Sequence, residues 1–320
     1  MKYSCILVRF VAVTAFSMLI SYSAAAFSNN PVATPAMASF SSGETQSTSH
    51  DSLHLAGENP TTLHWYDMIA NVPGNWVRYS KETFRTEKIP EYAAVAAATT
   101  ALVFTDNGTW RTADKWYRSS SSVKWASDFF TEMGDGRSQF GLAGAFAAYG
   151  LIAGDNRAVR TGSEIVEAVL ASGGVVQILK HITGRESPFV STQPTGIWRF
   201  FPNQIKYHKQ VPHYDAFPSG HLTTSLVTVI VVADNYPELT WIRPVGYALC
   251  GLISVSMVNT GIHWYSDYPL AIALGSAFGE IVAHPEGETV AHLGAQKKIP
   301  VSIGPFLNGS EVGVDVTLAL

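Results

Sequence analysis

The sequence predicts an all-α protein, a helical bundle that ends in a short β-hairpin. Long apolar or amphipathic stretches follow one another over residues 61–284, separated by clusters of Gly, Pro, Asn and Asp. Few segments of this region show the alternating pattern of a strand. Residues 299–320 then alternate apolar and polar side chains around an NGSE turn, which is typical of a β-hairpin.

The first 26 residues resemble a secretory signal peptide. Lys2 and Arg9 make the start positive, an apolar run follows, and Ala24 and Ala26 form a small-residue cleavage site. We therefore expect an exported protein, periplasmic if the source is a Gram-negative bacterium. An uncleaved membrane anchor is the alternative, because the apolar run nearly reaches the ~18 residues of a span.

The rest of the chain divides into three segments. Residues 27–60 are rich in Ser, Thr, Asn, Pro and Ala without a periodic apolar face, which predicts a flexible linker. Residues 61–285 form the all-α domain, and residues 286–320 form the hairpin tail. The predicted helical stretches are 92–104, 140–154, 163–182, 221–236, 245–258 and 268–284.

We expect these stretches to be buried helices of a soluble bundle. Their longest uncharged runs reach about 14–15 residues, short of the ~20 that a membrane span needs. Acidic residues also lie within or beside several of them, at Glu164, Glu167, Asp234 and Glu280. Membrane-spanning helices are the alternative, because only 14% of the residues are charged.

Composition excludes two classes of protein. The formal net charge of -4 over 320 residues gives no sign of a nucleic-acid surface. Cys5 and Cys250 are the two cysteines, and removal of a signal peptide would leave one, so the fold is not a disulfide scaffold.

A first polar cluster follows the predicted helix 163–182. The run LKHITGRESPF places Lys180 and Arg185 close together where the helical pattern breaks at Gly184. Two cations at this point could bind an anion. The alternative is an ordinary helix end, because Lys and Arg favour the last turn.

A second cluster, FPSGH, directly precedes the predicted helix 221–236. Ser219 and Gly220 would then lie at a helix N-terminus, where unpaired N–H groups and the helix dipole favour an anion. Glycine lets the backbone approach a ligand closely, and His221 could supply or accept a proton. The alternative is an N-cap serine beside a solvated histidine.

A third cluster is GIHWYSDYP. His263 and Asp267 are four residues apart, so on a helical turn they would share a face and could form a hydrogen bond. A carboxylate that fixes the tautomer of a histidine makes it a competent nucleophile. The alternative is a surface His–Asp pair. A bundle could bring all three clusters to one end, where they would suit a tetrahedral phosphate attacked by nitrogen.

The order and spacing of these motifs resemble the superfamily of type 2 phosphatidic acid phosphatases and vanadium haloperoxidases. The resemblance covers roughly residues 125–284, and the stretch MGDGRSQFGLAGAFAAYGL also resembles secreted bacterial members. It implies an all-α fold and hydrolysis of a phosphoric ester through a phosphohistidine, without a metal or other cofactor. Vanadate would act as an inhibitor or, in the haloperoxidase branch, as the cofactor.

The resemblance also implies a role for each matching residue. His263 would be the nucleophile, Asp267 its orienting carboxylate and His221 the general acid for the leaving alcohol. Lys180, Ser219 and Gly220 would bind the phosphate.

Two phosphate-binding arginines of the superfamily are missing. Ser187 stands in the slot before Pro188, and Met257 stands six residues before the nucleophile. A charge-assisted hydrogen bond contributes about 1.5–3 kcal/mol, so both losses would weaken transition-state binding. Arg185 is the candidate that could compensate as a phosphate ligand.

The sequence therefore predicts an exported phosphatase of the acid or lipid phosphate type. A lipid phosphate, an isoprenoid pyrophosphate and a soluble phosphomonoester are all open as substrates, and the sequence does not give the oligomeric state. One alternative is a phosphate- or vanadate-binding protein of the same fold with weakened catalysis, based on Ser187 and Met257. A vanadium haloperoxidase is a further alternative.

Residues 195–215 are expected to form a lid or rim above the site and to contact a lipid or a membrane surface. Three aromatic side chains could meet an acyl chain, and three cations could attract an anion. These residues are Trp198, Phe200, Phe201, Arg199, Lys206 and Lys209. The alternative is that the aromatic rings are core and the cations are solvated.

Overall fold

A computed structural model describes residues 66–285, 301–308 and 311–318 of the chain. The described residues fall into two separate units, a helical bundle that ends at Pro285 and a hairpin formed by residues 301–318. The predicted signal peptide and linker lie outside the described residues.

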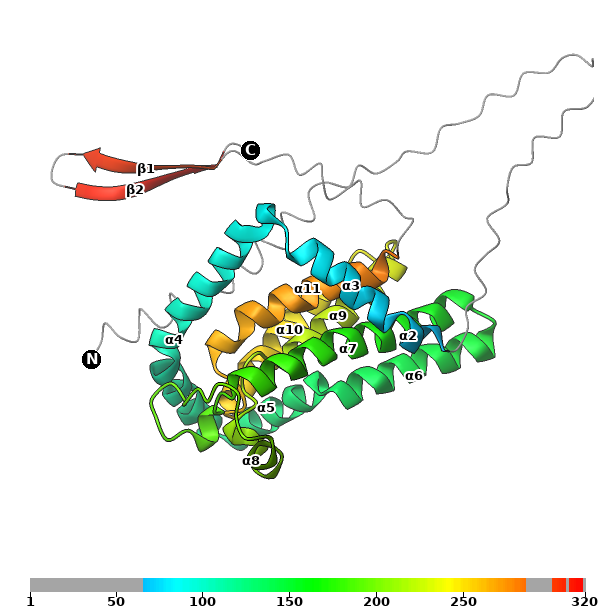
Figure 1. Ribbon diagram of the computed structural model, residues 1–320, viewed down its shortest axis with the longest axis horizontal. Coiled ribbons are helices and arrows are strands. Elements are labelled where there is room, and N and C mark those ends of the chain that lie inside the picture. Colours follow the sequence, from blue (N-terminus) through cyan, green and yellow to red (C-terminus); the bar gives the residue numbers. More distant parts are fainter. Residues whose placement is uncertain (1–65, 286–300, 309–310, 319–320) are drawn as a thin grey trace, which may run out of the picture. The chain divides into compact units, whose positions relative to one another are not determined.

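The bundle is built from helices alone, which confirms the all-α prediction (Figure 1). Six long helices coincide with the six stretches expected from the sequence: α4 (Ile89–Tyr117), α6 (Gly136–Ala153), α7 (Asn156–Thr183), α9 (Gly220–Asn235), α10 (Ile242–Asn259) and α11 (Tyr268–Ala283). The others are α2 (Asp67–Ala70), α3 (Val72–Thr83), α5 (Ser121–Gly134), α8 (Gln204–Lys209) and the 3-10 turns η1 (Thr86–Lys88), η2 (Pro188–Val190), η3 (Val211–His213) and η4 (Tyr265–Asp267).

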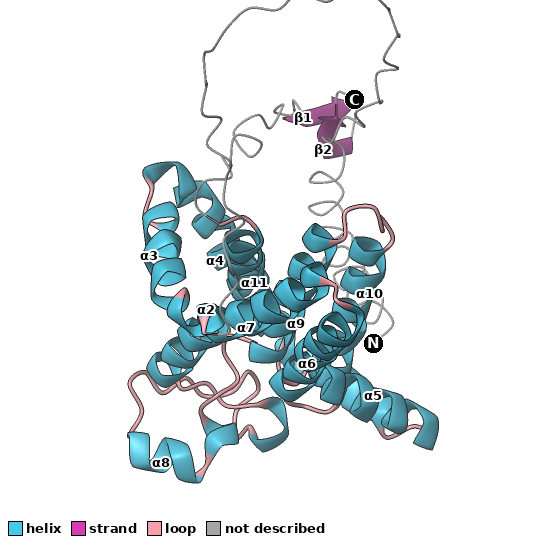
Figure 2. Cartoon of the chain, turned by 90° about the vertical axis from the view of Figure 1, so that its right-hand side faces the viewer, coloured by secondary structure: helices cyan, strands magenta, loops and turns pink. Residues whose placement is uncertain are grey.

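Helix α9 is the central element of the bundle. It packs against α7, α10 and α11, and Figure 2 shows it between them in a view along the bundle. Val227 and Val231 of α9 enter one apolar cluster, and Leu226 and Ile230 enter a second. Since α9 contributes to both clusters, its N-terminus has a fixed place at the end of the bundle.

Helices α9 and α11 pack closely because α11 presents glycine to α9. A Cβ atom at Gly279 would lie 2.9 Å from Ile230, and one at Gly275 would lie 3.0 Å from Leu226. Both distances are too short for a side chain, so the small residues set the distance between the helices. The N-termini of α9 and α11 carry the second and third motifs, which this packing brings together.

The ends of α7 and α9 follow from local sequence. Gly184 ends α7 in the left-handed conformation, with φ of 54°, which glycine adopts without steric cost. Ser219 caps α9, and its Oγ accepts a hydrogen bond from the backbone N–H of Leu222. The chain therefore enters the loop after α7 and leaves it again at the same end of the bundle.

Two of the described helices, α7 and α10, are long and apolar enough to cross a membrane. Buried helices of soluble bundles also pass this test, and both helices contribute to the core clusters. Length and composition therefore leave both interpretations open.

The hairpin consists of β1 (Val301–Asn308) and β2 (Glu311–Leu318), which pair antiparallel. Val301 pairs with Leu318, and Asn308 pairs with Glu311 next to the connection. The predicted hairpin around the NGSE turn is confirmed at the level of strand pairing.

Candidate active site

The three polar motifs meet at one end of the bundle. The backbone N–H of Ala216 donates to the carbonyl of Arg185, at 3.0 Å, and joins the second motif to the first. The N–H of Ser219 donates to the carbonyl of Asp267, at 3.2 Å, and joins the second motif to the third. The spatial clustering expected from the sequence is therefore present.

His263 is buried and held through one ring nitrogen. Its Nδ1 lies 2.7 Å from the backbone carbonyl of Ala216 and 3.4 Å from Oδ2 of Asp267. A carbonyl oxygen can only accept, so Nδ1 carries the proton and the Nε2 of the neutral ring keeps its lone pair. Nε2 is buried and has no hydrogen-bond partner among the described residues. The nitrogen that could attack phosphorus is thus free.

Asp267 is fully buried at the N-terminus of α11. It accepts hydrogen bonds from the backbone N–H of Trp264 at 2.7 Å and from a guanidinium nitrogen of Arg185 at 2.5 Å. The contact with His263 is formed across the 3-10 turn η4, whereas the sequence predicted that the two residues share a helical turn. The pairing is as expected, but its local geometry differs.

His221 occupies the second position of α9, with its ring centroid 5.9 Å from that of His263. Burial, followed by the neighbouring His263 and Lys180, lowers the pKa of His221 to about 3. Its Nε2 also lies 3.9 Å from a carboxylate oxygen of Asp135, the N-cap of α6. His221 is therefore neutral near pH 7 in the empty site.

Lys180 and the start of α9 form an anion-binding corner. A Cβ atom at Gly220 would lie 3.8 Å from Nζ of Lys180, so glycine leaves room beside the ammonium group. That ammonium group is buried and lies 3.6 Å from Asp215. The first N–H groups of a helix lack an intrahelical acceptor, so they and Lys180 can bind the oxygens of a phosphate together.

Arg185 is fully buried and already engaged with carboxylates. Its terminal nitrogens donate to Asp267, to Ser266 at 2.6 Å and to Asp106 at 2.7 Å. A further bond reaches the carbonyl of Thr195 at 3.0 Å. Its Nε is buried and has no hydrogen-bond partner among the described residues. The two terminal nitrogens therefore favour a role in orienting Asp267, and the phosphate contact expected from the sequence would have only Nε to use.

Two carboxylates of the site were not singled out in the sequence. Asp106 lies on α4, is fully buried and accepts hydrogen bonds from Arg185 and Ser266. Asp135 lies near His221. The signal for Asp106 was an acidic residue within the apolar run ALVFTDNG, which a buried helix carries only with a partner.

The two positions at which the chain differs from the superfamily motifs, Ser187 and Met257, are both buried. The side chain of Met257 lies fully buried in the apolar cluster with Leu222 and Ile253. Ser187 is 2% exposed, and its N–H donates to the carbonyl of Pro212. Neither supplies a charge to the site.

The predicted rim loop follows the first motif and contains α8. Phe200 and Phe201 are 65% and 77% exposed. Lys206 and Lys209 on α8 are also exposed. Trp198 is half-buried and packs on Phe217 of the second motif, with ring centroids 5.0 Å apart. Trp198 is thus partly packed against the site, whereas Phe200 and Phe201 are exposed, and their contact with an acyl chain stays a prediction.

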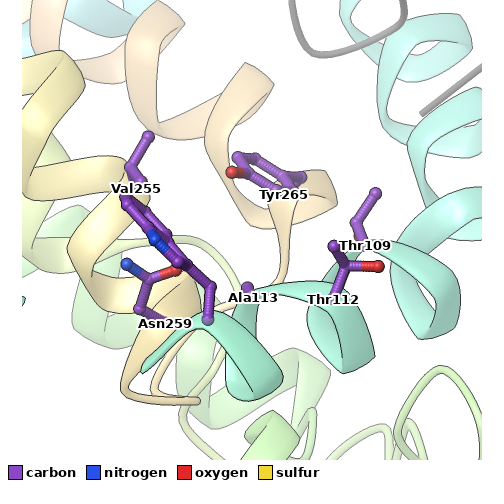
Figure 3. Close-up of a pocket in the computed structure, with 7 residues that line it drawn as sticks. Thr109, Thr112, Ala113, Val255, Asn259 and Tyr265 are labelled. Atoms are coloured by element: carbon purple, nitrogen blue, oxygen red, sulfur yellow. The ribbon is translucent and has the colours of Figure 1, made fainter. Parts of the chain in front are cut away.

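The cavities of the bundle lie beside this site. One, of 200 Å³, lies between α4, α10 and η4 (Figure 3) and is lined by Thr109, Thr112, Ala113, Trp116, Val255, Asn259 and Tyr265. A second, of 280 Å³, is lined by Tyr117, Asp128, Thr131, Glu132, Phe189, Thr260 and Ile262. Neither includes a candidate catalytic residue. Of the two histidines, His221 is the more exposed, with 24% of its side chain accessible against 2% for His263.

A separate titratable cluster lies at the far ends of α9 and α11. Ligand atoms of Asp234, Glu280 and His284 lie within 4.8 Å of one another. Asp234 is ion-paired with Arg243, so its negative charge is already balanced without a metal cation. The absence of a metal from the catalytic chemistry stays a prediction.

Comparisons with known proteins give one family model and one solved structure that resemble this chain. The family model of the PAP2 superfamily matches residues 162–285, which include all three motifs. Among solved structures, a transmembrane PAP2-type phosphatidylglycerolphosphate phosphatase from Bacillus subtilis matches with 14% identity and a TM-score of 0.39, covering 68% of this chain and 94% of that one. No curated protein sequence matches the chain.

Proposed function

Because residues 162–285 belong to the PAP2 superfamily, we propose that this protein is a phosphoric ester hydrolase that works through a phosphohistidine at His263. The observation that carries the proposal is the state of the His263 ring. Its Nδ1–H donates to the carbonyl of Ala216, with Asp267 beside it. Its Nε2 has no hydrogen-bond partner among the described residues, and the ring centroid of His221 lies 5.9 Å from its own. A histidine oriented in this way is a nucleophile at neutral pH.

The proposed reaction has two steps. Nε2 of His263 attacks phosphorus, the bond to the leaving oxygen breaks, and His221 gives that oxygen its proton. A water molecule then loses a proton to His221 and attacks the phosphohistidine, which releases phosphate, frees Nε2 of His263 and leaves His221 protonated as at the start. Asp267 stabilises the positive charge that develops on the ring of His263.

Phosphate binding raises the proton affinity of His221. In the empty site burial holds the pKa of His221 at about 3, so the ring cannot act as an acid at neutral pH. A phosphate dianion beside it favours the charged imidazolium. We propose that the substrate itself brings the proton onto His221, and that Lys180 and the N-terminus of α9 bind the remaining oxygens in place of a metal.

A second candidate function is phosphate binding with weak or no catalysis. Ser187 and Met257 replace two cations of the superfamily motifs, and Arg185 is engaged with Asp106 and Asp267. In this case phosphate or vanadate binds at Lys180 and α9, but turnover is absent.

A lipid phosphate is the substrate that the surroundings favour. The rim loop exposes Phe200, Phe201 and Ile205 beside Lys206 and Lys209, and residues 187–214 contain no acidic side chain. Apolar side chains next to cations suit the surface of an anionic membrane. The predicted signal peptide would place the protein outside the cytoplasm, where such a surface is available.

Phosphate release tests the proposal directly. Wild type and His263→Ala are assayed with a generic phosphomonoester and with a lipid phosphate in vesicles, without added metal and with a chelator. We expect turnover by wild type and a loss of at least ~10³-fold in the variant. Equal activity of the two proteins would exclude the proposal, and phosphate binding without turnover would establish the second candidate.

A further inference from the structure

Arg185 and Asp106 form a buried charge system behind the proposed nucleophile. Asp106, Arg185 and Asp267 are each fully buried, and the guanidinium lies between the two carboxylates. Asp106 comes from α4, which precedes the matched family segment of residues 162–285. A helix outside that segment thus reaches into the site.

The side chain of Ser266 ties the three charged groups together. The Oγ of Ser266 donates to Oδ2 of Asp106 and accepts from Arg185 at 2.6 Å. The backbone N–H of Ser266 also donates to Asp106, at 3.3 Å. Since Ser266 directly precedes Asp267, these bonds fix the turn that sets the position of the Asp267 carboxylate.

Charge balance explains why two carboxylates are needed. A buried arginine paired with Asp267 alone would neutralise it and leave no charge for the imidazolium of His263. Burial raises the pKa of Asp106, and its contacts with Arg185 and Ser266 oppose that rise. With Asp106 as its other partner, Arg185 shares its charge between two carboxylates, so Asp267 is not fully neutralised on the side of His263. The remaining charge of Asp267 becomes useful when phosphorylation makes the ring cationic.

We propose that Arg185 and Asp106 are positioning residues that orient Asp267 and keep it charged toward His263, and that Arg185 is not a ligand of the phosphate. The expected effect on kcat rests on the proposed function. The expected effect on the Kd of phosphate does not depend on turnover. The two residues are expected to act on the chemical step, while Lys180 acts on phosphate binding.

The test compares three variants of the full chain. Asp106→Asn keeps the shape of the side chain, removes its charge and replaces one of its two accepting oxygens by an NH2 group that can only donate. Arg185→Lys keeps the positive charge and loses the bridge between the two carboxylates. Lys180→Gln serves as the phosphate-binding reference. Asp114→Asn is the control, because Asp114 lies on the same helix and pairs with the largely exposed Arg118. Circular dichroism melts establish that each variant is folded.

We expect Asp106→Asn and Arg185→Lys to lower kcat at least tenfold and to leave the KM and the Kd of inorganic phosphate within threefold of wild type. Lys180→Gln should raise that Kd at least tenfold, and Asp114→Asn should change neither quantity. A kcat of Asp106→Asn within twofold of wild type would overturn the inference. So would an Arg185→Lys variant whose phosphate Kd rises as far as that of Lys180→Gln, a result that needs no turnover. If wild type itself shows no turnover, the proposed function fails, and the phosphate Kd still decides whether Arg185 is a ligand.

Discussion

At the scale of single residues, the two histidines have different environments that match different tasks. His263 is 2% exposed in its side chain and is tied through Nδ1, whereas His221 is 24% exposed and lies nearer the opening. The sequence identified both residues and their partner Asp267 from motif spacing. It did not identify Asp106, because a contact between α4 and η4 depends on packing between distant segments.

The depressed pKa of His221 makes the stability of the empty protein depend on pH. The unfolded histidine binds a proton near pH 6.5 and the folded one near pH 3, so the unfolded chain binds more protons between these values. The free energy of unfolding of the wild type should therefore fall as the pH drops from 6.5 toward 3. Urea titrations at several pH values measure this slope. His221→Asn should flatten it, and an unchanged slope would show that His221 is not the group responsible.

Restoring one missing arginine should harm the protein. Met257 is fully buried among apolar side chains, so Met257→Arg places an unpaired charge in the core. We expect a loss of about 3–5 kcal/mol in the free energy of unfolding and no gain in activity. Met257→Leu conserves volume and should cost less than about 1.5 kcal/mol. A stable, more active Met257→Arg variant would show that this position faces the phosphate after all.

At the scale of elements, hydrophobic periodicity predicted the six long helices and missed α3 and α5. Both helices are amphipathic, but neither contains the long apolar run that marked the other six in the sequence, and within α3 no residue is fully buried. The rim loop was predicted as a unit, but the split between half-buried Trp198 and exposed Phe200 and Phe201 depends on how the loop turns back over Phe217.

The rim loop should control membrane binding without affecting the chemistry. Phe200→Ser combined with Phe201→Ser should lower binding to anionic vesicles and slow hydrolysis of a lipid phosphate at least about tenfold, because two inserted aromatic side chains are lost. Hydrolysis of a soluble phosphomonoester should stay within twofold. Trp241→Ser is the matched control, since Trp241 is 59% exposed and precedes α10 at the other end of that helix from Asn259. Equal vesicle binding by all three proteins would show that the rim loop does not control membrane binding.

At the scale of the whole molecule, the bundle acts as a rigid frame that holds three short motifs at helix ends. The packing of α9 against α7, α10 and α11 fixes the N-terminus that we propose as the anion site, and glycines on α11 set its distance from the third motif. A sequence reveals such motifs through spacing. It does not reveal which buried ion pairs hold them, as Arg185 illustrates.

Anion binding should stabilise the entire bundle. A ligand at 100 times its Kd raises the free energy of unfolding by about 2.7 kcal/mol when it binds only the folded state. We expect phosphate or vanadate to raise the melting temperature of wild type by several degrees. The increase should be much smaller for Lys180→Gln, whose ammonium group is removed from the corner beside Gly220. An equal increase in both proteins would place the anion elsewhere.

The most direct test of the central claim is to trap the covalent intermediate. Wild type is mixed with substrate, quenched in alkali within milliseconds, digested, and the phosphorylated peptide is located by mass spectrometry. The substrate is an aryl phosphate, whose leaving group departs without a proton from His221. We expect an alkali-stable, acid-labile phosphoryl group on His263 that is absent from His263→Ala and accumulates in His221→Asn, which lacks the base for the second step. Turnover with no phosphoryl group on His263 in either wild type or His221→Asn would contradict the account.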